Sequence, residues 1–169
     1  MPATVNVNFR TVVHKDSGGM CMGFPDVCLT PAPPAPPIPI PYPNIAMSSD
    51  TSQGTTTVTA DGNPFMVKES SFSKSSGDEA GSAGGGVASS CQMGKAEFVN
   101  YSFDVQAEGK NVCRLADLML LNKQSAPNTP PFPEIQAPLV MIPMLATEET
   151  TQQWGMEQMV VGDEAPAEE

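Results

Sequence analysis

The sequence has little of what most globular enzymes use to build a core. Aromatic residues make up 6% of its 169 residues and charged residues 16%, whereas glycine and proline are abundant, at 14 and 18 residues. This mix serves an α-helical or α/β core poorly, because glycine and proline interrupt helices. It favours short strands joined by tight turns, and the length favours one domain with a tail.

Residues for familiar catalytic sites are also scarce. His14 is the sole histidine, and the sequence contains no G-x-S-x-G, C-x-x-C, G-x-G-x-x-G or P-loop motif. Their absence argues against serine hydrolase, thioredoxin-like and nucleotide-binding sites. A Cys–His dyad formed by His14 and one cysteine remains a catalytic alternative.

Positive charge is scarce as well, and the formal net charge is −11. From Glu134 onward the chain carries eight acidic residues and neither lysine nor arginine. Nucleic-acid binding requires clustered basic residues that neutralise phosphates, so we expect no nucleic-acid partner.

The sequence also lacks a long apolar run. The longest apolar stretch, residues 138–145, is too short to cross a bilayer and contains Pro143. The chain does not open with the charged and apolar regions of a secretory signal peptide. We therefore expect synthesis in the cytoplasm, where the four cysteines would be thiols or metal ligands rather than disulfides.

Three segments repeat one pattern. Residues 9–15 (FRTVVHK), 62–68 (GNPFMVK) and 109–115 (GKNVCRL) each follow a run of alternating residues, and they lie roughly 50 residues apart. Alternation is typical of strands with one buried face, and it continues in the third copy through Tyr101, Phe103, Val105 and Ala107. The glycines of the second and third copies suit tight turns. The sequence therefore predicts an all-β fold with three hairpins and approximate threefold symmetry.

Two segments of unusual composition separate these repeats. Residues 31–43 contain eight prolines, and because proline lacks an N–H we predict an extended, polyproline-like segment. It would serve as a stiff linker, as a ligand for a proline-binding module, or as a strap that packs across the domain through Ile38, Ile40 and Tyr42. Residues 70–90 are small and polar, which favours either a flexible linker or a loop packed closely against other backbone.

The proline-rich residues 128–133 (NTPPFP) indicate a boundary. We predict a domain over residues 1–125 and a proline-containing, acidic extension over residues 126–169. The extension would be partly disordered or fold only on a partner, with Leu139 to Leu145 and Trp154 as candidate anchors. The alternative is an acidic tail that only aids solubility.

The cysteines and the histidine offer a structural metal site. Zinc binds thiolate and imidazole in tetrahedral sites, and a closed site stabilises the fold. Thiolate-rich sites also accept iron. The candidate ligands match no zinc-finger spacing, so only a fold that gathers distant turns would bring them together. The alternative is that the cysteines are small buried hydrophobic residues. The candidates are His14, Cys21, Cys28, Cys91 and Cys113.

Several strings between residues 5 and 122 together resemble the PAAR-like domain family. The last of them, EGKNVCRLAD, is similar to the G-K-P-A-A-R core that names the family. In chain order the strings are VVHKDSGG (12–19), FPDVCLTP (24–31), PIPIPYPNIA (37–46), GDEAGSAGGGV (77–87), GKAEFVNYSFDV (94–105) and EGKNVCRLAD (108–117).

This resemblance implies a small, conical, three-sided β-prism without catalytic activity. PAAR proteins cap the VgrG-type trimeric spike of type VI secretion systems and related contractile injection machines, one tip per homotrimer. They sharpen the spike for membrane piercing, contact the target membrane transiently and leave the cell when the machine fires. Effectors are fused to the domain or travel beside it, and a zinc near the apex is typically held by three histidines and a cysteine.

The chain departs from this family in its histidine content. Residues 117–122 (DLMLLN) contain no histidine where family members often carry one. Either cysteines replace the missing ligands or packing alone holds the apex. We predict a zinc site formed by His14, Cys28, Cys91 and Cys113, with Cys21 as the substitute for any of them. Two other functions stay open: an effector-loading adaptor that acts through the tail, and a metal-dependent enzyme with a Cys/His site.

Overall fold

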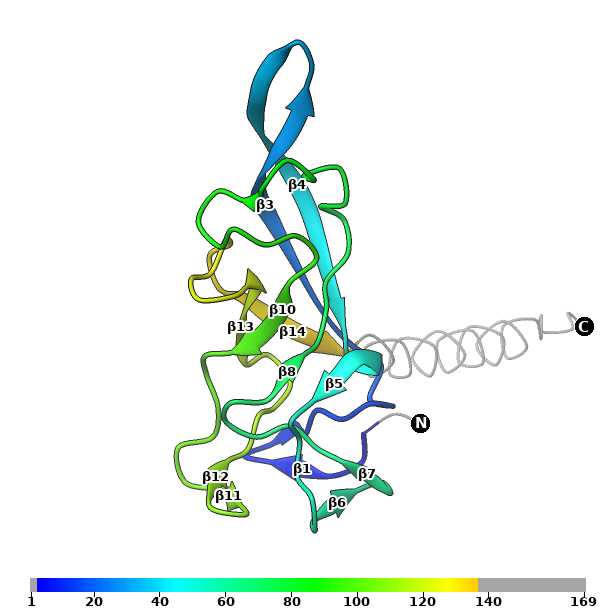
Figure 1. The fold of residues 1–169 in the computed structure, drawn as a ribbon. Coiled ribbons are helices and arrows are strands. Elements are labelled where there is room, and N and C mark those ends of the chain that lie inside the picture. The colour runs from blue at the N-terminus through cyan, green and yellow to red at the C-terminus, as the bar shows by residue number, and fades with distance from the viewer. Residues whose placement is uncertain (1–2, 137–169) are drawn as a thin grey trace, which may run out of the picture. The chain divides into compact units, whose positions relative to one another are not determined.

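The computed structural model describes residues 3–136, which belong to a compact unit that ends at Gln136 (Figure 1). The prediction of an all-β fold is confirmed. Within these residues the helical content is a single 3-10 turn, Ser48–Asp50, and no α-helix occurs. None of the helical segments described is long and apolar enough to cross a membrane.

Eight strands form one antiparallel sheet in the order β4-β3-β14-β13-β10-β8-β5, with β9 paired to β3. The long strand β3 organises this sheet, because its first residues pair with β14 and β4 on opposite sides and Cys28 and Leu29 pair with β9. The strands are β3 (Gly19–Ala32), β4 (Ala35–Met47), β5 (Thr51–Ser52), β8 (Ser71–Phe72), β9 (Gly85–Gly86), β10 (Lys95–Phe98), β13 (Leu118–Lys123) and β14 (Phe132–Gln136).

The strand β14 carries the compact unit beyond the predicted domain end at residue 125. Its residues pair with β13 on one side and with β3 on the other, as Met119↔Phe132 and Cys21↔Glu134. The proline-rich residues 128–133 therefore lead into a strand of the sheet. The candidate anchors at residues 139–145 and Trp154 lie outside the described residues.

Three short hairpins lie at the wide end of the unit (Figure 1), one in each predicted repeat. They are β1–β2 (Asn6–Val7 with Arg10–Thr11), β6–β7 (Thr59–Ala60 with Asn63–Pro64) and β11–β12 (Gln106–Ala107 with Lys110–Asn111). We call these hairpins, with residues 3–5, 56–58 and 103–105 before them and residues 12–17, 65–70 and 112–117 after them, the base.

The alternation in the third repeat gives a shorter strand than expected. Only residues 106–107 join a hairpin strand, and the Phe103 side chain is 85% exposed. The cause is local: the Val105 amide donates to the Ser102 hydroxyl, which itself bonds to Asp104. This side-chain turn takes the place of a strand ladder.

Two apolar clusters fill the interior. The smaller one lies in the base and consists of Val12, Ala60, Phe65, Val67 and Val112. The larger one begins at the centre of the base with Val13, Met66 and Cys113 and continues into the sheet. There Phe72 and Phe98 meet edge-to-face, with ring centroids 5.8 Å apart.

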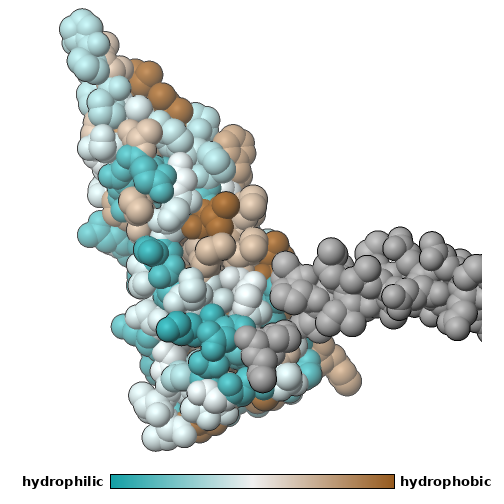
Figure 2. All heavy atoms as spheres, turned by 90° about the vertical axis from the view of Figure 1, so that its right-hand side faces the viewer, coloured by the Kyte–Doolittle hydropathy of each residue, from teal (hydrophilic) through white to brown (hydrophobic). Residues whose placement is uncertain are grey.

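Most of the proline-rich segment, residues 35–43, belongs to strand β4, so the segment is neither a polyproline linker nor a strap. Its residues pair with β3 in one register from Asp26↔Tyr42 to Thr30↔Ile38, and after a register shift Ala32 pairs with Ala35. We call this outer part of the β3–β4 hairpin, residues 26–42, the arm. It forms the narrow end of the unit, where Figure 2 shows apolar spheres and Ile38 is 45% exposed.

The spacing of the prolines explains why they are compatible with a strand. Proline cannot donate a hydrogen bond, so the pairs Val27↔Pro41 and Leu29↔Pro39 must be the non-hydrogen-bonded pairs of the ladder. In such pairs the amide nitrogens point away from the partner strand. The prolines therefore remove only outward-facing donors, which protects an edge strand from further pairing.

The glycine-rich stretch in residues 70–90 is the closely packed loop, the second of the two alternatives. Gly81 lies against the Cys28 side chain, and Gly85 lies against the Cys91 backbone so closely that a side chain would not fit. Gly85 also has a φ of +73°. Glycine is required here because backbone passes backbone.

Candidate functional site

The three hairpin turns of the base share one backbone conformation. Each has two central residues with positive φ: Asn8 and Phe9 (50° and 64°), Asp61 and Gly62 (51° and 78°), and Glu108 and Gly109 (52° and 76°). Two positive φ values define the type I′ turn, whose twist matches that of the flanking strands. The three repeats therefore present the same turn at equivalent positions.

The segments after the hairpins close a triangle. Bridges join Val12 to Arg114, His14 to Phe65, and Val67 to Val112, so each segment contacts both others. The second residue of each segment is fully buried, and these residues are Val13, Met66 and Cys113. Backbone hydrogen bonds also join them, from Met66 to Val13 at 2.7 Å and from Cys113 to Met66 at 3.0 Å.

A ring of side-chain hydrogen bonds joins each turn to the segment before another hairpin. Asp61 accepts hydrogen bonds from the backbone and hydroxyl of Thr4, and Glu108 accepts them from the Thr57 amide at 2.6 Å and hydroxyl at 2.9 Å. In the third pair Asn8 donates to Asp104 at 3.0 Å. In all three links, one partner is the first residue of a hairpin turn. The three links are therefore equivalent, and together they close the ring.

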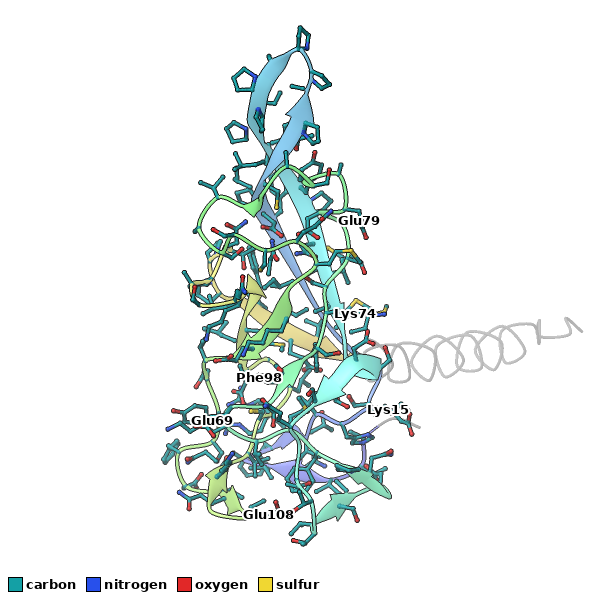
Figure 3. All side chains as sticks on the ribbon, viewed as in Figure 1. Lys15, Glu69, Lys74, Glu79, Phe98 and Glu108 are labelled. Carbon is teal, nitrogen blue, oxygen red and sulfur yellow. The ribbon has the colours of Figure 1, made fainter. Side chains whose placement is uncertain are left out.

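These hydrogen bonds hold the ring carboxylates in their charged form. Hydrogen bonds from the Thr57 backbone and its neighbours lower the pKa of Glu108 to about 2. The Thr4 hydroxyl and amide lower the pKa of Asp61, and the Ser102 hydroxyl with Asn8 lowers that of Asp104. Glu108 is labelled in Figure 3 at the base.

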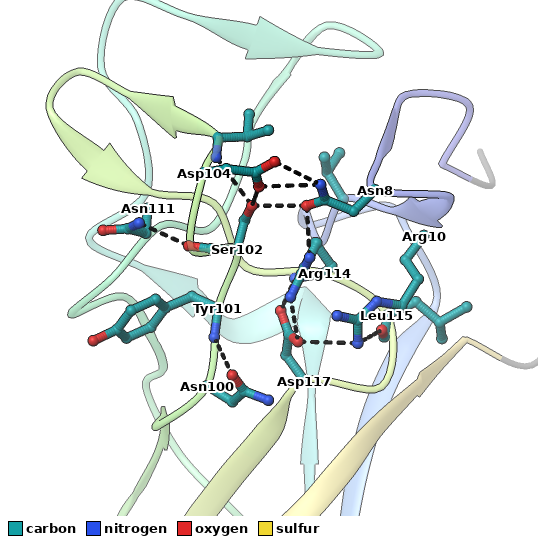
Figure 4. Close-up of polar contacts among 12 residues, drawn as sticks. Asn8, Arg10, Asn100, Tyr101, Ser102, Asp104, Asn111, Arg114, Leu115 and Asp117 are labelled. Carbon is teal, nitrogen blue, oxygen red and sulfur yellow. Dashed lines mark hydrogen bonds and ion pairs between the residues drawn. The ribbon is translucent and has the colours of Figure 1, made fainter.

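His14 and Arg114 occupy equivalent positions in the base. His14 Nε2 lies 3.2 Å from Asp61, and Arg114 donates to Asn8 at 2.6 Å, so both contact the first turn residue of another hairpin. Figure 4 shows the Arg114 corner, where Asp117 binds the guanidinium from the other side. His14 therefore links two repeats of the base, as Arg114 does.

A second cluster lies at the root of the arm and consists of Asp26, Cys28 and Asp78. One potential ligand atom from each lies within 4.8 Å of the others, and all three side chains are fully buried. Asp26 and Cys28 lie two residues apart on β3, which places both on one face, and Asp78 comes from the loop between β8 and β9. The Cys28 sulfur lies 3.7 Å from a carboxylate oxygen of each aspartate.

Asparagine side chains surround this cluster. Nδ2 groups of Asn44, Asn122 and Asn128 donate to Asp26, that of Asn44 at 2.6 Å. Met93 donates its backbone amide to Asp78 at 3.0 Å. The Oδ1 atom of Asn44 is buried without a hydrogen-bond partner.

The electrostatics of the cluster suit a cation. Burial, together with Asp26 and Asp78, raises the pKa of the Cys28 thiol to about 12, and burial also raises the pKa of Asp78. A divalent cation would offset the repulsion between the carboxylates and favour the thiolate. One thiolate and two carboxylates are a donor set that zinc accepts. The residues present therefore fit a metal ion.

The structure places the predicted ligands in different environments. Cys28 belongs to the cluster, and Cys91 is linked to it through Asn122, which accepts from Cys91 at 3.1 Å and donates to Cys28 at 3.7 Å. Cys113 lies at the centre of the base, Cys21 in the same apolar cluster, and His14 at a corner of the base. The structure thus places only one of the five candidates, Cys28, in the Asp26–Cys28–Asp78 cluster.

Sequence reasoning missed the two aspartates. Both lie inside strings that carried the resemblance, Asp26 in FPDVC and Asp78 in GDEAG. The spacing Asp-x-Cys within a strand was the available signal, since residues i and i+2 share a face. The contribution of Asp78 depends on loop packing, which the spacing does not reveal.

Two comparisons with known proteins find similarity. The family model described as Toxin PAAR-like domain matches residues 19–128, a range that includes the whole Asp26–Cys28–Asp78 cluster. The DNase toxin Tse7 of Pseudomonas aeruginosa PAO1 is 43% identical over 132 residues, which cover 75% of this chain and 34% of that toxin. The chain thus spans about a third of the length of this curated relative. No solved structure matches.

Proposed function

The chain belongs to the toxin PAAR-like domain family, and on that premise we propose that it forms the spike tip of a type VI secretion system or a related contractile injection machine. One copy would cap the end of a VgrG-type homotrimer and sharpen it for membrane piercing. It would also help to carry effectors out of the cell when the machine fires.

The threefold base is the observation that carries this proposal. A single chain supplies three equivalent turns, three equivalent links of one closed hydrogen-bonded ring and three equivalent buried residues at its centre. A homotrimer presents three identical surfaces about one axis, so a pseudo-threefold base is the shape that a single chain needs to match all three. Val5 and Val58, at equivalent positions, are 41% and 44% exposed and would supply apolar contacts.

We also propose a structural zinc ion at Asp26, Cys28 and Asp78. The site would tie the loop of Asp78 to β3 at the root of the arm, where the unit narrows (Figure 1). A metal there would stabilise the apex against the force of penetration. Only Cys28 is common to this cluster and to the ligand set predicted from the sequence, which was His14, Cys28, Cys91 and Cys113 with Cys21 as substitute. The proposed site therefore uses Asp26 and Asp78 as the other ligands.

Native mass spectrometry of the chain, alone and mixed with the VgrG-type spike protein encoded near its gene, tests both proposals. We expect one chain per spike trimer and one zinc ion per chain. The Cys28→Ser variant should lose the zinc ion. The Cys91→Ser variant, in which a thiol outside the cluster is replaced, is the control and should keep it. A chain that binds no spike protein would refute the tip function, and zinc retained by Cys28→Ser would refute the site.

The name of the relative suggests a second function, that of a nuclease. We propose instead that the segment shared with this DNase toxin is its delivery part. In the described residues, both His14 and the Asp–Cys–Asp cluster are fully buried, so neither offers DNA an accessible reactive group. Plasmid DNA incubated with the chain and Mg²⁺ or Zn²⁺ should stay intact, and cleavage would identify the segment as a nuclease.

The effector-loading adaptor is the remaining alternative, and truncation separates it from the tip function. Because β14 ends at Gln136, the truncation should begin at residue 137 so that the sheet is kept. A tip protein without residues 137–169 should still cap the spike and support secretion of the spike protein. Loss of one effector alone would assign cargo loading to these residues.

A further inference from the structure

The three corners of the base are equal in backbone and unequal in chemistry. Each corner pairs the second turn residue of one hairpin with the segment before another hairpin. Two corners carry Gly62 with Ala3, and Gly109 with Thr56. The remaining corner carries Phe9 and Phe103, and these residues are 103% and 85% exposed.

Phe9 is unfavourable for the fold in two respects. Its φ is +64°, in the left-handed region, at a turn position where the other two repeats have glycine. A bulky side chain is disfavoured there because its Cβ approaches the backbone. The ring is also fully exposed, so no packing within the described part of the chain compensates for the conformation.

Phe103 lies on the same corner. Asn8, which precedes Phe9, bonds to Asp104 at 3.0 Å and to Ser102 at 2.7 Å, the residues on either side of Phe103. Arg114 holds Asn8 from the interior, and Asp117 holds Arg114 (Figure 4). The two exposed rings are therefore mounted on a rigid, hydrogen-bonded support.

We propose that Phe9 and Phe103 form an aromatic anchor that inserts into an apolar recess on one subunit of the spike trimer. This inference rests on the proposed tip function. The threefold base fits the trimer in three equivalent rotations, and the anchor engages one subunit in each of them. Exposed aromatic side chains on a rigid support are typical of the residues that dominate binding energy at interfaces. The complex is thus held asymmetrically, although both surfaces are close to threefold.

The test replaces each phenylalanine by the residue that stands at the equivalent position in another repeat. Phe9→Gly and Phe103→Thr, singly and together, are compared with the wild type by biolayer interferometry on immobilised VgrG-type spike trimer. We expect the double variant to bind at least about tenfold more weakly. Phe24→Ser, which removes an equally large ring that is 58% exposed on β3, is the matched control and should bind within about twofold of the wild type.

Thermal unfolding separates this effect from misfolding. Phe9→Gly should unfold at the same temperature as the wild type or higher, because glycine adopts positive φ without strain. Weaker binding with unchanged or higher stability supports the anchor, and unchanged binding overturns it. If the wild type itself does not bind the trimer, the tip function fails with it. Wild-type binding that the variants leave unchanged refutes the anchor alone.

The proposal would also be overturned if the Phe9–Phe103 corner bound a second copy of this chain or a lipid surface instead of the spike trimer. Size-exclusion chromatography with light scattering would reveal a dimer of this chain that Phe9→Gly dissolves. Sedimentation with phosphatidylglycerol vesicles would reveal lipid binding lost in the double variant. Either result, with unchanged binding to the trimer, assigns the aromatic corner to that partner.

Discussion

The base and the arm are built in opposite ways. The hairpin strands of the base are two residues long, and side chains such as Asp61 and Glu108 join them. The arm belongs to strands of 14 and 13 residues. Backbone ladders hold it, mainly between β3 and β4 and also between β3 and β9, with few polar side-chain contacts towards its end. The shape of the base therefore depends on a few side chains, whereas that of the arm depends on a backbone pattern that tolerates substitution.

The largest loss of stability is expected from substitution of Asp117 in the base. This fully buried carboxylate binds the Arg114 amide and guanidinium and pairs with Arg10 at 3.1 Å. Asp117→Ala would leave the Arg114 guanidinium buried without a counter-ion, which should lower the free energy of unfolding by about 3–5 kcal/mol in a urea titration.

Ser70 is the matched control for Asp117, because it occupies the equivalent turn in the second repeat. Its hydroxyl accepts a hydrogen bond from the Val67 amide at 3.0 Å, as Asp117 does from Arg114 at 2.8 Å. Ser70→Ala should lower the free energy of unfolding by only about 1 kcal/mol. Equal losses in the two variants would contradict a special role for buried charge in the base.

The second largest effect on stability is expected at Glu134, a residue of β14 that links the base to the beginning of β3. Its backbone bonds to Ala116 and Asp117, it pairs with Cys21, and both carboxylate oxygens are buried without hydrogen-bond partners. Burial raises the pKa of Glu134 from 4.5 to about 8. The folded protein keeps the proton while the unfolded chain releases it, so stability should fall as pH rises from about 4.5 to about 8.

Urea titrations at pH 5 and pH 8.5 measure this loss, which should be on the order of a few kcal/mol. Glu134→Gln cannot ionise and should remove most of the decline between the two pH values. A variant with the same decline as the wild type would rule out Glu134 as its source.

Acid should distinguish the base from the arm. The ring carboxylates have lowered pKa values, about 2 for Glu108, so their stabilisation is complete above about 4.5 and is lost as pH falls towards 2. In amide hydrogen exchange by NMR, the protection factor of the Thr57 amide, which donates to Glu108, should be lower at pH 2 than at pH 6, because about half of Glu108 is then protonated. Arm amides such as Ile40 should keep their protection factors. Equal losses of protection in both regions would contradict a separate acid response.

The smallest effect on stability is expected in the arm. Pro39→Ala and Pro41→Ala together should change the free energy of unfolding by less than about 0.5 kcal/mol, since both nitrogens face outward. The new N–H groups would leave an open strand edge, so the variant should self-associate in sedimentation velocity experiments. Pro36→Ala, near the arm tip, serves as control and should remain like the wild type.

The sequence predicted the base better than the arm. The repeated pattern placed all three hairpins, because alternation and turn residues are local signals that the base preserves. The first turn was harder to recognise, since Phe9 stands where glycine is expected. The arm was misread because the number of prolines outweighed their spacing. Pro37, Pro39 and Pro41 stand at every second position, which leaves the inward-facing N–H groups between them intact.

The candidate metal cluster could be predicted only in part. Cys28 was predicted as a ligand, but the predicted set consisted of histidine and cysteines and did not include Asp26, two residues away. Cys113 and His14 looked like ligands by type, whereas threefold equivalence with Met66 and Arg114 gives them structural positions in the base. Such equivalence becomes visible only when the repeats are placed around a common centre.

The closed ring of the base also sets the order in which the chain can fold. The arm joins residues within 26–42 and can pair as soon as that stretch has left the ribosome. The ring instead joins Asn8 to Asp104 and Thr57 to Glu108, so the first hairpin must wait for nearly a hundred further residues. Contacts between such distant residues form slowly. The arm is therefore expected to form early in synthesis, and the base is expected to close last.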